Sequence, residues 1–156
     1  MKVAREIMNK KVITFSPNDS IFNVAKVFSK KDISGAPIVK RNKIVGMITL
    51  ADIIRFIDLK LSNLPTMYVP GLTSLLLMFI QMEKINIDFK KEMKKITRIK
   101  IKDVMKTRIV TVKPEATILE VAEIMDRNNV HRVPVVENRK IVGIIARSDV
   151  IKGLIL

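Results

Sequence analysis

The chain has 156 residues, of which 48% are hydrophobic and 28% charged, and its formal charge at pH 7 is +14. This length can bury a substantial core, and the absence of cysteine excludes disulfides, thiolate metal sites and a cysteine nucleophile. The positive charge suits an anionic partner, but it is spread along the chain, and only 4% aromatic residues leave little for nucleic-acid bases to stack on. A nucleic-acid role is therefore our alternative interpretation.

The N-terminus, MKVAREIMNKKV, lacks the apolar run and the cleavage site of a signal peptide. The best apolar stretch, Leu72 to Met82, is shorter than the roughly 17 to 25 residues that span a bilayer. We expect a cytoplasmic protein without a membrane span.

Most of the chain is an internal duplication. Residues 5–54 align with residues 102–151 at a constant offset of 97, without a gap, and 15 of the 50 positions are identical. Each copy opens with a short apolar run that ends in threonine, Val12–Thr14 or Ile109–Thr111, and a proline follows. We expect each of these runs to form a strand.

The next element of each copy is a helix, which starts at Ser20 or at Thr117. Thr117 and Glu120 form the spacing of a capping box. Apolar side chains follow at i, i+3, i+4 and i+7, which predicts one buried face per helix. They are Ile21, Val24, Ala25 and Phe28 in the first copy and Ile118, Val121, Ala122 and Met125 in the second.

Two short apolar strands follow each helix, APIVK with KIVGMIT and VPVVE with KIVGIIA, and the dipeptides RN and NR between them predict tight hairpins. A second helix starts near Asp52 or Asp149. Each copy is thus a β-α-β-β-α repeat of the α/β (α+β) class. One repeat leaves a sheet face uncovered, so we expect two repeats to form one folding unit about a pseudo-twofold axis.

The predicted division is residues 1–60 for the first repeat, 61–100 for a helical insert and 101–156 for the second repeat. The insert begins with the turn-rich SNLPTMYVPG, and the remainder indicates one or two helices. Its basic second half, DFKKEMKKITRIK, is amphipathic. We favour a helical hairpin packed on the repeats over a membrane-surface or partner-binding element.

The repeats resemble a tandem cystathionine-β-synthase-type (CBS) domain pair of the stand-alone prokaryotic type. The resemblance rests on KDVM, with REIM in the first copy, on VHRVPVV, and on the paired elements GMITLAD and GIIARSD. It implies a regulatory protein rather than an enzyme, with no catalytic residues, no metal and no required cofactor. The implied ligand is AMP, ADP, ATP or S-adenosylmethionine, bound in two clefts between the repeats, and the implied partners are a regulated protein and a second copy in a homodimer.

The resemblance also implies which residues form each cleft. The first cleft combines Thr49, Asp52, Ile109, Val110, His131 and Arg132. An aspartate at a strand-to-helix corner can accept hydrogen bonds from ribose hydroxyls, and a helix N-terminus favours phosphate. The second cleft combines Val12, Ile13, Ser34, Gly35, Ser148 and Asp149.

The second cleft departs from the family pattern. Ala146 replaces the threonine, and Ser34–Gly35 stand where the other copy has His131–Arg132, so this cleft lacks obvious phosphate donors. Ser148 is a candidate substitute. We therefore expect two clefts of unequal ligand choice.

Structural roles are open alternatives for the same residues. Thr49 and Asp52 also fit a capping box, although Asp149 argues against a purely capping role because Ala146 cannot cap. His131 is as easily structural as ligand-binding. The rival function is a structural or nucleic-acid-binding adaptor that uses the basic surface.

Overall fold

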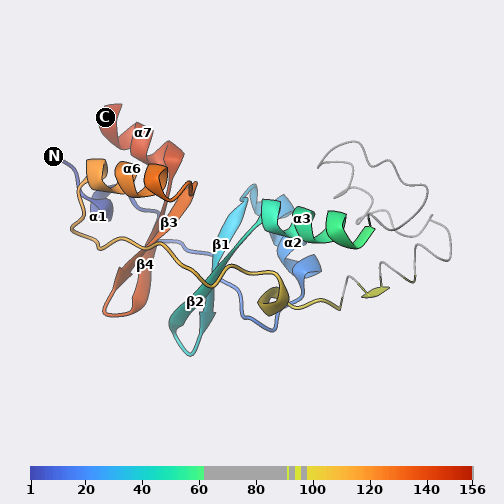
Figure 1. Cartoon of the computed structure of the whole chain (residues 1–156). Coiled ribbons are helices and arrows are strands. Elements are labelled where there is room, and N and C mark those ends of the chain that lie inside the picture. The colour runs from blue at the N-terminus through green and yellow to red at the C-terminus, as the bar shows by residue number, and fades with distance from the viewer. Residues whose placement is uncertain (62–90, 92–93, 96–97, 156) are drawn as a thin grey trace. The chain divides into compact units, whose positions relative to one another are not determined.

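The computed structural model describes residues 1–61, 91, 94–95 and 98–155 (Figure 1). The mixed α+β class that the sequence predicts is confirmed. The predicted helices of the insert fall largely on residues 62–90, 92–93 and 96–97, outside the described residues. In chain order the elements are α1 Ala4–Ile7, α2 Ile21–Lys31, β1 Gly35–Lys40, β2 Lys43–Thr49, α3 Leu50–Leu61, the 3-10 turn η2 Ile101–Asp103, α6 Ile118–Arg127, β3 Arg132–Glu137, β4 Lys140–Ala146 and α7 Arg147–Ile155.

Helices α2 and α6 begin where the sequence predicts. The Ser20 hydroxyl accepts the backbone N–H of Phe22 at 3.2 Å, and the Thr117 hydroxyl accepts that of Glu120 at 3.3 Å. The Glu120 carboxylate returns the bond by accepting the backbone N–H of Thr117 at 2.7 Å, which completes the capping box and lowers the pKa of Glu120 below its usual range. The predicted inner faces are buried, except that Ala122 is only partly covered.

Both predicted hairpins are present. β1 pairs with β2, and β3 pairs with β4 in antiparallel register. The two turn residues of each hairpin have positive φ, 50° and 60° at Arg41 and Asn42, and 50° and 65° at Asn138 and Arg139. Two consecutive residues with positive φ match the right-handed twist of the flanking strands, so two-residue loops suffice.

The predicted first strand of each repeat is reduced to one residue. Residues 12–14 and 109–111 form no strand, and pairing is limited to parallel bridges of Phe15 with Ile38 and of Val112 with Val135. Pro17 and Pro114 follow two residues later, and proline lacks the N–H that would extend the pairing beyond the bridge toward the helix. The second helices begin near the aspartates as predicted, at Leu50 and Arg147, two residues before Asp52 and Asp149.

The N-terminal segment of each repeat hydrogen-bonds to the other repeat. The backbone N–H groups of Ala4 and Arg5 donate to the carbonyls of Ala116 and Pro114, at 2.7 and 2.9 Å. In the reverse direction, the N–H groups of Ile101 and Lys102, at the start of the second repeat, donate to the carbonyls of Asp19 and Pro17 of the first repeat, at 2.9 and 3.0 Å. These contacts join residues about a hundred positions apart.

Two compact units result, and neither coincides with one repeat. Unit 1 comprises Met1–Phe15, Ala36–Met47 and Lys106–Leu156, and unit 2 comprises Ser16–Gly35 and Ile48–Met105. Within unit 1, α1, α6 and α7 gather beside the β3–β4 hairpin (Figure 1). No helix within the described part of the chain has the length and apolar character needed to cross a membrane.

Each unit has buried apolar side chains. In unit 1, Ala4, Val121, Val133 and Ile145 are fully buried in one cluster. Gly143 is required there, because a Cβ at this position would lie 2.7 Å from Cγ and 2.9 Å from Cβ of Met8. In unit 2 the most buried residues are Ile21, Val24, Phe28, Ile48, Ile53, Ile57 and Ile101.

Candidate functional site

The strand-to-helix corner of the first repeat holds a buried carboxylate. β2 ends at Thr49 and α3 begins at Leu50, so Asp52 lies in the first turn of the helix. Its Oδ2 accepts the backbone N–H of Thr49 at 3.0 Å and the Thr49 hydroxyl at 2.7 Å, and the Thr49 hydroxyl accepts the N–H of Asp52 at 3.2 Å. Asp52 is only 5% exposed, and it is the one buried polar or charged residue in the described part of the chain.

These bonds show that Thr49 and Asp52 form a capping box. The reciprocal pattern satisfies two backbone donors at the start of α3. The cap engages Oδ2, whereas Oδ1 faces the Arg55 guanidinium, with 3.6 Å between Oδ1 and Nη1. A carboxylate oxygen accepts more than one hydrogen bond, so the capping role does not exclude a ligand contact.

The corner of the second repeat keeps half of this arrangement. The Asp149 Oδ2 accepts the backbone N–H of Ala146 at 2.8 Å. Asp149 therefore caps its helix, contrary to the expectation drawn from Ala146, because this cap needs only the backbone N–H of residue 146. Asp149 is partly exposed, and Ser148 is exposed.

His131 and Arg132 lie beside the second corner within their own repeat. Arg132 pairs with Ala146 in the β3–β4 register, and the His131 carbonyl accepts the N–H of Arg147 at 3.1 Å. His131 is exposed and Arg132 is partly buried. In the first repeat, the Ser34 carbonyl likewise accepts the N–H of Leu50 at 2.9 Å, and Gly35 is the buried first residue of β1.

The four apolar residues that the sequence places in the clefts are Val12, Ile13, Ile109 and Val110. All four are partly buried in extended segments without regular pairing. Val110 packs against the core of unit 1, so it has a structural role as well.

The residues predicted for each cleft belong to different compact units. Thr49 and Asp52 are in unit 2, whereas Ile109, Val110, His131 and Arg132 are in unit 1. In the second set, Ser34 and Gly35 are in unit 2, and the other four are in unit 1. Their assembly into two clefts stays a prediction.

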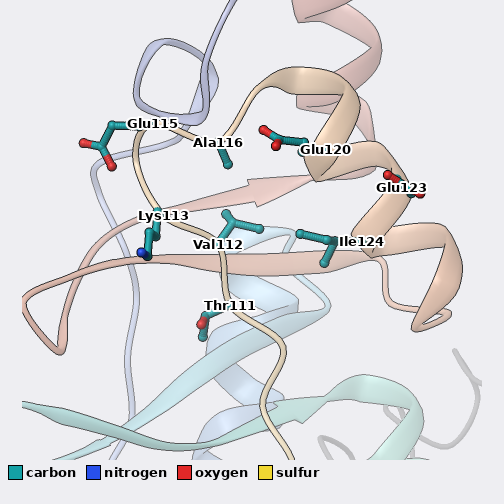
Figure 2. Close-up of a pocket in the computed structure, with 8 residues that line it drawn as sticks. All are labelled: Thr111, Val112, Lys113, Glu115, Ala116, Glu120, Glu123 and Ile124. Carbon is teal, nitrogen blue, oxygen red and sulfur yellow. The ribbon is translucent and has the colours of Figure 1, made fainter.

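A hollow that the sequence did not indicate lies in unit 1. It has a volume of about 490 Å³ and opens between the segment after Thr111 and helix α6 (Figure 2). Val112, Ala116 and Ile124 form its apolar part, and Lys113 and three glutamates surround them. None of the predicted ligand residues lines it.

A second hollow of about 330 Å³ lies in unit 2. It is lined by Phe28, Ser29, Asp32, Ile33, Ser34 and Leu50, of which Ser34 is a predicted ligand residue.

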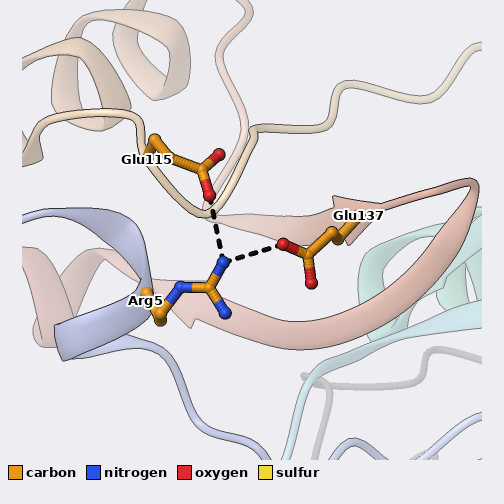
Figure 3. A network of polar contacts seen from close by, with 3 residues as sticks. All are labelled: Arg5, Glu115 and Glu137. Carbon is orange, nitrogen blue, oxygen red and sulfur yellow. Dashed lines mark hydrogen bonds and ion pairs between the residues drawn. The ribbon is translucent and has the colours of Figure 1, made fainter.

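The glutamates of the larger hollow already have partners. Arg5 donates from one Nη to Glu115 at 3.0 Å and to Glu137 at 2.8 Å (Figure 3). The hydrogen bond from Arg5 lowers the pKa of Glu115 below its usual range. Glu120 caps α6, and Glu123 pairs with Arg127. These contacts stabilise local structure, and we assign the hollow no ligand.

Comparisons with known proteins identify the family. The family profile of the CBS domain matches residues 4–59 and 101–156, more than half of the chain. Protein MJ1426 of Methanocaldococcus jannaschii is 35% identical over 161 residues, which cover 97% of this chain and 90% of that protein. Inosine-5'-monophosphate dehydrogenase of the same organism is 29% identical over 154 residues, which cover 97% of this chain and 23% of the enzyme.

A solved structure agrees with the sequence relatives. The CBS domain pair of protein MJ0100, in complex with 5'-methylthioadenosine and S-adenosyl-L-methionine, superposes with a TM-score of 0.67 at 25% identity. The match covers 98% of this chain and 99% of that chain. With both repeats matched and the fold shared, the chain belongs to the CBS domain family.

Proposed function

We propose that this chain is a regulatory module that binds an adenosine-containing ligand and carries out no chemical reaction. The observation that carries the proposal is the buried Asp52 carboxylate, which Thr49 holds at the start of α3. The complex of the related MJ0100 domain pair with two adenosyl compounds supports this ligand class.

The chemistry of the first set of residues suits a nucleotide. The two ribose hydroxyls are donors, and a carboxylate is a strong acceptor for them because each bond is charge-assisted. Arg132 and the N-terminus of α3 supply positive charge for phosphate. Ile109 and Val110 supply apolar surface for the adenine base.

The second set of residues suits a ligand without phosphate. Asp149 offers a ribose acceptor, and Val12 and Ile13 offer apolar contacts. Ser34, Gly35 and Ser148 carry no charge, so an adenosyl group is recognised there without a cation. S-adenosylmethionine and 5'-methylthioadenosine carry no phosphate and suit the second set of residues. AMP, ADP and ATP carry phosphate and suit the first set.

Regulation requires a protein that responds to the ligand. A ligand shifts a conformational equilibrium only by its differential affinity for the two states, so the partner must distinguish the bound from the unbound module. The match to 23% of a dehydrogenase shows that a related segment occurs inside a larger enzyme. We propose that the present module acts on a regulated protein, which is either attached to it or separate.

A panel of ligands tests the proposed function. In thermal unfolding, adenosine, AMP, ADP, ATP or S-adenosylmethionine should raise the melting temperature. A ligand at about 100 times its dissociation constant adds about 2.7 kcal/mol to the free energy of unfolding. GMP at the same concentration is the matched control for a purely ionic effect.

Two results of thermal unfolding, with the panel or with an added oligonucleotide, would contradict the proposal. One is the absence of any shift with every adenosine compound at millimolar concentration. The other is stabilisation by an oligonucleotide that is lost steeply as salt rises, which would favour the adaptor function because phosphate-backbone binding depends strongly on salt.

The module should also be a homodimer. Leu119 on α6 and Ile151 and Leu154 on α7 are each more than half exposed. The two helices pack together, and exposed apolar side chains on such a pair favour an interface. Light scattering at tens of micromolar protein should give twice the chain mass of 17.8 kDa. The double variant Ile151→Glu, Leu154→Glu should give the monomer mass, while Lys152→Glu on the same helix should remain dimeric. A monomer for the unsubstituted chain would overturn this expectation.

A further inference from the structure

The residue that follows Asp52 by one helical turn differs in its contacts between the two repeats. Arg55 places Nη1 3.6 Å from the Asp52 Oδ1, the oxygen that Thr49 does not engage. The equivalent residue of the second repeat, at the constant offset of 97, is Lys152. It makes no ion pair with Asp149 among the contacts of the described residues. The cation therefore interacts with the corner carboxylate in the first repeat only.

The ion pair of Arg55 and Asp52 is asymmetric in its burial. The Arg55 side chain is 65% exposed, while the Asp52 side chain is 4% exposed. Arg55 can leave at small cost, because a mostly hydrated cation gains little from an ion pair. The buried carboxylate keeps its cap from Thr49 when Arg55 leaves.

A ribose that binds to Asp52 must share Oδ1 with Arg55 or displace it. A neutral ligand such as adenosine offers the displaced guanidinium no anion, so the lost ion pair is a net cost. A phosphorylated ligand brings an anion that attracts the same guanidinium, and this attraction offsets the cost. The balance therefore depends on the phosphate.

We propose that Arg55 is a specificity-determining residue that disfavours neutral adenosyl ligands at the Asp52 corner relative to phosphorylated ones. This inference rests on the proposed function, since it assumes that Asp52 accepts the ribose. It assigns no such selectivity to the Asp149 corner, where the contacts of the described residues include no ion pair with Lys152.

Calorimetric titration with adenosine and AMP tests the inference. The background is Asp149→Asn, which removes the charge of the second corner while its side-chain oxygen can still accept the Ala146 N–H. In this background Arg55→Ala should tighten adenosine binding about two- to fivefold, the range of an exposed ion pair, and should not tighten AMP binding. Lys152→Ala is the matched control and should change neither affinity.

The dependence of adenosine affinity on salt is a second readout. A merely structural role of Arg55 would not produce such a dependence. Adenosine is uncharged, so its affinity should rise between about 50 and about 500 mM salt as the competing ion pair is screened. In Arg55→Ala the affinity should be independent of salt. Because Arg55 and Lys152 are exposed, Arg55→Ala and Lys152→Ala should both have the melting temperature of the Asp149→Asn background.

The outcomes separate the inference from the proposed function. If adenosine and AMP bind but Arg55→Ala leaves the ratio of their affinities unchanged, or if Lys152→Ala changes it equally, this inference is overturned and the proposed function stands. If neither compound binds to the unsubstituted chain, the proposed function fails and the inference fails with it.

Discussion

Asp52→Ala should abolish the tighter, phosphate-dependent binding of AMP or ATP. Each charged hydrogen bond to a ribose hydroxyl that is lost costs about 1.5 to 3 kcal/mol, which corresponds to roughly 10- to 150-fold in affinity. Asp149→Ala should instead weaken a site that responds little to the number of phosphates. Calorimetry of both variants with adenosine, AMP and ATP measures the difference.

The capping role of Asp52 has to be separated from ligand binding in this experiment. Loss of the cap on α3 costs about 1 kcal/mol of stability by itself. Asp149 also caps its helix, through Ala146, so Asp149→Ala is a control that is matched in this respect. Equal loss of AMP affinity in the two variants would show that the cap alone accounts for the effect.

Arg132→Ala completes the assignment of the first set of residues. Because it removes a phosphate partner and leaves the ribose acceptor in place, it should resemble Asp52→Ala for AMP and ATP but weaken adenosine much less. Unchanged nucleotide affinity in Arg132→Ala, or loss of phosphate-dependent binding in Asp149→Ala alone, would contradict the pairing of residues between the repeats.

Local patterns in the sequence predict local structure well in this chain. The helix faces followed from the i, i+3, i+4, i+7 spacing, and Ser20 and Thr117 marked the helix starts because their hydroxyls cap backbone donors. The hairpin turns followed from asparagine in the two-residue loops, although arginine shares each turn at positive φ.

Contacts between distant segments were not predictable in the same way. Arg5 belongs to the first repeat by sequence, yet its partners are Glu115 and Glu137 of the second, because the N-terminal segment packs on that repeat. No periodicity signals a pairing over 110 or 132 residues. The strand expected at residues 12–14 failed for a related reason, since pairing depends on the partner strand and reaches only Phe15.

The sequence proposes which residues form the candidate site, but it does not predict the contacts that these residues make. The duplicated corner pointed to Thr49, Asp52 and Asp149 from residue types alone. The aligned sequences do not reveal which carboxylate oxygen is engaged, because this depends on side-chain geometry. The same holds for the ion pair that Arg55 forms with Asp52, which has no Lys152–Asp149 counterpart among the contacts of the described residues.

Phe28→Ala should be among the most destabilising substitutions in the described chain. Phe28 is the largest fully buried side chain, on the inner face of α2, which packs against α3. Truncating a buried phenylalanine costs about 3 to 5 kcal/mol, because apolar contacts are lost and a cavity remains. For a domain of this size, that loss lowers the melting temperature by about 6 to 20 °C.

Thermal and denaturant unfolding of Phe28→Ala measures this loss directly. Ser29→Ala, the exposed neighbour on the same helix, is the matched control and should change stability by less than about 0.5 kcal/mol. At the equivalent position of the second repeat, Met125 is also buried, and Met125→Ala should cost about 2 to 5 kcal/mol. A loss below about 1 kcal/mol in Phe28→Ala would mean that α2 does not belong to the cooperative core, because a helix that contributes its inner face to that core cannot lose its largest side chain at so little cost.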